Sequence, residues 1–139
     1  MRIRYHWELD VYELAREGRK RVFELSKGFP REELYSLTDQ IRRSSRSVCA
    51  QIAEAWGRRL YRDDLVNRLN QAESEARETQ SWLETAVECE YVAQEIGKEL
   101  FELYHEVIGK LINMENNPDK WVIGRRKPES RRAGKGLSE

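Results

Sequence analysis

The sequence has little of several features that define common protein classes. Its 139 residues include only 3 prolines and 2 cysteines, and its formal net charge is zero. No apolar run of about 18 residues occurs, so we expect no membrane-spanning helix. The first ten residues, MRIRYHWELD, lack the apolar core of a signal peptide. We therefore expect a cytoplasmic protein without a membrane partner.

The sequence also lacks the patterns that support catalysis. Cys49 and Cys89 have no CxxC partner, so we expect two reduced, small core residues within helices. Neither a Gly-rich phosphate loop nor a nucleophile–base pair is present. Glu102 and His105 have the Glu-x-x-His spacing of di-iron bundles, but such a site needs two of these motifs and further glutamates. We expect no enzyme, no metal and no cofactor, with a metal-binding bundle enzyme as an alternative.

What the chain does contain is charge patterned for amphipathic helices. Charged residues make up 36% of the sequence, and its length fits one domain. The first predicted helix runs from about Trp7 to Lys27, where apolar positions alternate gaps of four and three residues. Gly18 lies on this apolar seam. Because glycine is unfavourable inside a helix, we expect Gly18 to make room for a neighbouring helix.

The stretch from Phe29 to Arg62 predicts a long second helix with one apolar and one cationic side. The helix begins either at Pro30 or after a short turn capped by Ser36 or Thr38. Its apolar stripe comprises Leu34, Leu37, Ile41, Ser44, Val48, Ile52 and Ala55. Its opposite face carries Arg42, Arg43 and Arg46, continued by Arg58, Arg59 and Arg62. Such a helix needs partner helices to cover its apolar side.

Two further amphipathic segments supply these partners. The third helix is expected to start at Asp63 or Asp64, with acidic outer faces and the seam Leu65, Leu69, Ala72, Ala76, Thr79, Leu83 and Ala86. The fourth uses Ile96, Leu100, Leu103, Val107, Leu111 and Met114, and ends before Pro118. The boundary near Tyr91 to Gln94 has no glycine or proline, so the third helix running further is an open alternative.

These segments predict an all-α fold, an antiparallel up-down four-helix bundle with a disordered basic C-terminal tail. We place the bundle at residues 1–118 and the flexible tail at 119–139. The last 20 residues carry a charge of +5 and the remaining 119 carry −5. Trp121, Val122 and Ile123 form a short apolar cluster that we expect to dock on the bundle. A charge asymmetry of this kind favours either an anionic partner or attraction between tail and body.

The second helix carries a resemblance to a known family. Phe29-Pro30, Glu33, Leu37, Gln40-Ile41-Arg42-Arg43, Ser47-Val48 and Ile52-Ala53-Glu54 resemble the signature FPxxExxxLxxQxRRxxxSxxxxIAE. This signature belongs to four-helix-bundle proteins encoded in intervening sequences of bacterial 23S ribosomal RNA genes. The accessory proteins of diversity-generating retroelements resemble the same family. The resemblance implies a homopentameric ring, with a basic surface for RNA or DNA in the retroelement relatives.

Two basic elements are the candidate nucleic-acid contacts. The tail offers Arg125, Arg126, Lys127, Arg131, Arg132 and Lys135, which can bind phosphates. Arg42, Arg43 and Arg46 either bind phosphates or pair with the acidic third helix. We therefore expect a self-assembling, non-enzymatic bundle that binds nucleic acid or a nucleic-acid-processing partner such as a reverse transcriptase. The alternative is a small protein-binding adaptor without a nucleic-acid role.

Overall fold

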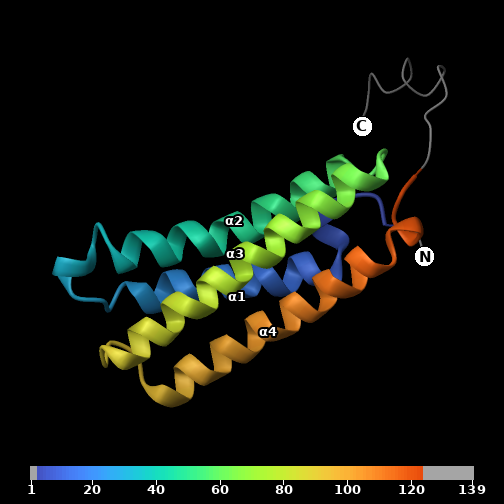
Figure 1. The fold of residues 1–139 in the computed structure, drawn as a ribbon. Helices are drawn as coiled ribbons and strands as arrows, with labels where there is room; N and C mark the ends of the chain where they lie inside the picture. Colours follow the sequence, from blue (N-terminus) through green and yellow to red (C-terminus); the bar gives the residue numbers. More distant parts are fainter. Residues whose placement is uncertain (1–2, 124–139) are drawn as a thin grey trace.

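The computed structural model describes residues 3–123, and these form an all-helical fold (Figure 1). The four main helices are α1 (Asp10–Ser26), α2 (Leu37–Gly57), α3 (Arg62–Glu88) and α4 (Gln94–Asn116). Short 3-10 turns are η1 (His6–Glu8), η2 (Arg31–Glu33) and η3 (Pro118–Lys120). The predicted four-helix fold is confirmed. The predicted tail lies outside the described residues from position 124 onward.

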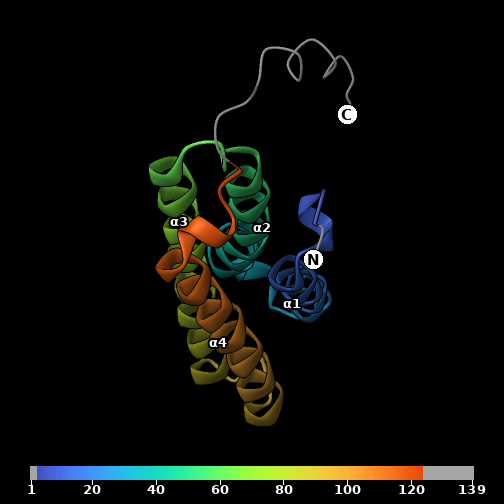
Figure 2. The same ribbon diagram turned by 90° about the vertical axis from the view of Figure 1, so that its right-hand side faces the viewer.

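Successive helices run in opposite directions, as their contacts show. Along α2 and α3, Ser44 meets Thr79 whereas Gln51 meets Arg68, so partner numbers fall as residue numbers rise. Each helix packs on its neighbours in sequence, and α1 closes the bundle against α4. Figure 2 shows α2 lying between α3 and α1. Within residues 3–123 no helix is long and apolar enough to cross a membrane.

The predicted seams of α2 and α3 lie in the core, with one exception. All seven predicted positions of α3 are buried: Leu65, Leu69, Ala72, Ala76, Thr79, Leu83 and Ala86. On α2 the stripe from Leu37 to Ala55 is also buried, but Leu34 precedes the helix and is 43% exposed. Ser44 and Thr79 form a buried polar pair between these helices, where the Thr79 hydroxyl donates to Ser44 Oγ at 2.8 Å. Burying these two hydroxyls is possible because Ser44 Oγ in turn donates to the Ile41 carbonyl at 3.3 Å, so both groups have partners.

The predicted face of α4 is wrong at its first turns. Ile96 is 40% exposed and Leu103 only partly buried, whereas Gly97 and Tyr104 face the core. The reason is a close approach between helices: a Cβ at position 97 would collide with the side chain of Val87 on α3. Since only glycine permits this contact, it turns α4 so that Gly97, rather than Ile96, faces the bundle.

Gly18 is the close-approach point that the sequence predicts. It is buried on α1, and a Cβ there would lie 2.7 Å from Tyr104 Oη. The hydroxyl of Tyr104 has no hydrogen-bond partner, and burial raises the pKa of this phenol far above its usual range. A bulky ring on α4 therefore fills the space that the missing side chain on α1 leaves.

The helix ends also explain two features that the sequence left open. α2 begins at Leu37, and Glu33 accepts hydrogen bonds from the Leu37 amide at 3.2 Å and from the Ser36 hydroxyl. α3 ends at Glu88, because Glu90 adopts a positive φ of 63° and the Tyr91 amide bonds the Ala86 carbonyl. That bond is the pattern of a helix C-terminus that normally uses glycine. Cys89 lies in this turn and is exposed, so its predicted core position is wrong.

The segment after α4 folds back on the bundle, as expected for the apolar cluster. Trp121 packs edge-on against Trp56, with 6.2 Å between ring centroids. The Ile123 amide donates to the Arg59 carbonyl at 3.2 Å. The two ends of the described chain therefore meet, since Ile3 and Trp121 line the same pocket.

Candidate functional site

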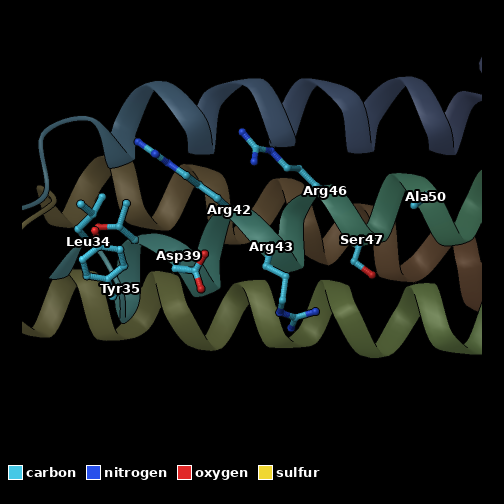
Figure 3. Close-up of a pocket in the computed structure, with 9 residues that line it drawn as sticks. Leu34, Tyr35, Asp39, Arg42, Arg43, Arg46, Ser47 and Ala50 are labelled. Carbon is cyan, nitrogen blue, oxygen red and sulfur yellow. The ribbon is translucent and has the colours of Figure 1, made fainter.

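A shallow groove lies on the outer surface of α2, between α1 and α3 (Figure 3). Its volume is about 750 Å³, and its lining is Leu34, Tyr35, Thr38, Asp39, Arg42, Arg43, Arg46, Ser47 and Ala50. All three candidate arginines of the second helix therefore belong to one surface feature. The groove combines their charge with two exposed apolar side chains at its end.

The three arginines of the groove point in two directions (Figure 3). Arg43 extends towards α3, where its guanidinium forms ion pairs with Glu75 at 3.3 Å and with Glu78. The hydrogen bond to Glu78 raises the pKa of Arg43. Burial acts to raise the pKa of Glu78, but hydrogen bonds from Arg43 and Trp82 outweigh it and lower that pKa. For Arg43, the structure brings together the basic helix and its acidic neighbour within one chain.

Arg42 and Arg46 extend towards α1 instead and form no ion pair with a carboxylate within residues 3–123. Their guanidinium carbons lie 4.8 and 5.6 Å from the ring centroid of Phe23. Arg42 Nε also donates to Ser26 Oγ at 2.7 Å. Contact with an aromatic face holds a cation in place without cancelling its charge. These two arginines are therefore positioned but not neutralised.

Two arginines of α1 act on a buried cysteine of α2. Arg19 and Arg16 act electrostatically on Cys49, which lies buried on α2. Burial is the larger effect and raises the pKa of the Cys49 thiol to about 11, although the two arginines act to lower it. Cys49 thus stays a neutral core thiol.

The sequence pattern does not predict that Leu34 and Tyr35, at the end of the groove, are exposed. Tyr35 is 90% exposed, and both residues lie in the turn between η2 and α2. The apolar periodicity assigns Leu34 to the core because it assumes that the helix already includes this position. The sequence left a helix start after Ser36 open as an alternative. With that start, Leu34 and Tyr35 precede the helix and fall outside its apolar stripe.

The remaining arginines predicted to continue the cationic face do not join the groove. Arg58 and Arg62 approach Asp64 and Asp119 at 4.0 and 3.5 Å, at the other end of α2. Arg59 stacks on the Trp56 ring, with its guanidinium carbon 3.9 Å from the centroid. The predicted continuous cationic face is therefore wrong, because the chain turns away at Arg58. The six basic residues of the tail lie outside the described range.

The alternative metal site at Glu102 and His105 has no further ligating side chains grouped around it in the described part of the chain. Glu102 and His105 are both exposed on α4. Residues 3–123 contain no group of three or more His, Cys, Asp or Glu side chains that could hold a metal ion. Among the described residues, the groove on α2 gathers three of the predicted site residues, Arg42, Arg43 and Arg46.

Comparisons with known proteins give a consistent result. A family model described as 23S rRNA-intervening sequence protein matches residues 7–113. The fold is similar, with a TM-score of 0.70, to a crystal structure of a protein with unknown function from the S23 ribosomal protein family of Bacteroides thetaiotaomicron. The two sequences are 32% identical, and the match covers 76% of this chain and 95% of that chain. No curated protein matches the chain.

Proposed function

The chain belongs to the 23S rRNA-intervening sequence protein family, and from this premise we propose that it is a non-enzymatic, self-assembling bundle that binds nucleic acid through the groove on α2. The observation that carries the proposal is the pair Arg42 and Arg46, which are held by Phe23 and lack a carboxylate partner among the described residues. Phosphate oxygens are the natural partners of such guanidinium groups. The basic residues of the tail, between Arg125 and Lys135, add further candidate phosphate contacts by their charge.

Assembly is the second half of the proposal. The resemblance implies a homopentamer, and closed rings join two different surfaces of each subunit. Exposed aromatic residues such as Trp7 and Phe101, which are 57% and 40% exposed, suit such contacts. A nucleic-acid enzyme such as a reverse transcriptase is the protein partner that the retroelement relatives suggest. Light scattering of the purified chain at micromolar concentration should give a multiple of 16.5 kDa, and a monomer would contradict this assembly.

The binding test compares paired substitutions of equal charge. Replacing Arg42 and Arg46 with Gln removes two charges from the groove, whereas Lys20→Gln with Lys98→Gln removes two exposed charges elsewhere. Binding to a generic RNA is measured across a salt series. The slope of affinity against salt should fall, in the groove variant alone, by about 0.7–0.9 for each phosphate that the groove no longer binds. Equal binding by the wild type and the groove variant would refute the proposed site, and an adaptor role would then be favoured.

A further inference from the structure

We propose that the groove binds a single strand, with one base stacked on Tyr35 and the adjoining phosphates on Arg42 and Arg46. The inference rests on the proposed function and specifies its ligand. It follows from the order of side chains along α2, where the aromatic ring lies at one end and the cations follow (Figure 3). A nucleotide offers the same two chemistries, a flat apolar base and an anionic phosphate, joined at a short distance.

The turn that carries Tyr35 is held in a fixed shape. Glu33 accepts from the Ser36 hydroxyl, from the Tyr91 hydroxyl at 2.8 Å and from the Leu37 amide at 3.2 Å. The hydrogen bond from Ser36 is the largest of these effects, and together they lower the pKa of Glu33. A charged acceptor therefore ties this turn to the start of α2 and to the loop before α4. The Tyr35 ring projects from a pre-organised backbone, which reduces the entropy lost on stacking.

Exposure of Tyr35 is not sufficient by itself, since single apolar residues are common on protein surfaces. What distinguishes Tyr35 is that it shares the groove with Arg42 and Arg46, which no carboxylate neutralises within residues 3–123. Tyr61 provides the contrast: it is 64% exposed at the opposite end of α2, where Arg58 and Arg62 already approach aspartates. An aromatic ring can stack only on a base whose face is free, and bases inside a duplex are covered by their neighbours.

The cations have a spacing that suits a strand lying along the helix. Arg42 and Arg46 are four residues apart, which places them about one turn, or roughly 6 Å, apart along α2. Both reach the same side of the helix, towards Phe23. Asp39 is the acidic residue among the described groove lining, and it lies between the ring and the cations in sequence. Its carboxylate can accept hydrogen bonds from base amino groups or a ribose hydroxyl.

The test uses the full-length protein and two labelled probes, an oligouridine of about 20 nucleotides and an RNA duplex of matched charge. Tyr35→Ala should weaken single-strand binding by about 5- to 150-fold, which is the loss of one base–aromatic stack. Tyr35→Phe, which keeps the ring, should bind as the wild type does. Tyr61→Ala is the matched control for an exposed tyrosine and should leave binding unchanged. The Tyr35→Ala variant should retain the wild-type salt slope, whereas Arg42→Gln should lower it by about 0.7.

Three results would overturn the inference. The first is that Tyr35→Ala binds oligouridine as tightly as the wild type. The second is that the duplex binds at least as tightly as the single strand. The third is that the loss of binding in Tyr35→Ala is accompanied by a change of molar mass in light scattering. The last result would make Tyr35 a subunit contact. The proposed function fails separately, when substitution of Arg42 and Arg46 together leaves binding unchanged. Weakened binding in that double variant with unaltered binding in Tyr35→Ala removes only the stacking assignment.

Discussion

Two carboxylates meet between α3 and α4 in a way that links stability to pH. Glu115 Oε2 is buried without a hydrogen-bond partner, and Asn70 Nδ2 donates to Oε1 at 3.5 Å. Burial, followed by the nearby Glu73 carboxylate, raises the pKa of Glu115 to about 7. Arg77 forms an ion pair with Glu73 at 2.8 Å. A proton on Glu115 would supply the missing donor between the two carboxylates.

We expect the folded bundle to be more stable in mild acid than at pH 8. The folded state keeps a proton on Glu115 that the unfolded chain releases near its ordinary pKa of 4.5, so this stability is lost as the pH rises through about 7. Glu115→Gln removes the titration and should flatten the pH dependence of the melting temperature between pH 5 and 8. Glu106→Gln, an exposed change on the same helix, is the control. An unchanged pH profile in Glu115→Gln would contradict the pairing.

At the scale of a helix, α3 depends on small side chains at its centre. Ala72 and Ala76 are fully buried on the seam, close to the hydrogen-bonded pair of Ser44 and Thr79. Replacing either alanine with Leu forces a larger side chain into a filled space. We expect a loss of about 1–3 kcal/mol in the free energy of unfolding, measured by urea denaturation. Ser74→Leu, on the exposed face of the same helix, should cost little. Equal stability of all three variants would show that the interface has room to spare.

The elements differ in how far the sequence predicts them, and the reason is physical. The seam of α3 follows one regular period throughout, so every predicted position is buried. In α4 the apolar period allows Ile96 to face the core as well as it allows Gly97. The contact between Gly97 and Val87 decides which of the two does so. That contact is tertiary and leaves no local signal. The groove was half predictable, because its arginines stand out in sequence while Tyr35 depends on where α2 begins.

At the scale of the whole molecule, we expect the bundle to carry the stability and the tail to contribute only to binding. All four helices and the docked Trp121 lie before Gly124. Deleting residues 124–139 should therefore leave the helicity of the bundle and the number of subunits unchanged, while weakening RNA binding. The salt slope should fall by about 0.7–0.9 for each phosphate that the six basic residues bind in the full-length chain. Filter binding across a salt series, paired with thermal melts, measures both; full affinity and slope after truncation would show that the tail does not contribute.

The point where the chain leaves the bundle has a consequence for valency. The Ile123 amide bonds the Arg59 carbonyl, so this exit is fixed beside the turn between α2 and α3. In a ring of identical subunits, rotation about the axis repeats that exit once per subunit at a single height. A long polyanion captured by one subunit would then meet the next at a high effective concentration. Avidity in such an assembly should grow with polymer length far more steeply than the strength of any one contact suggests.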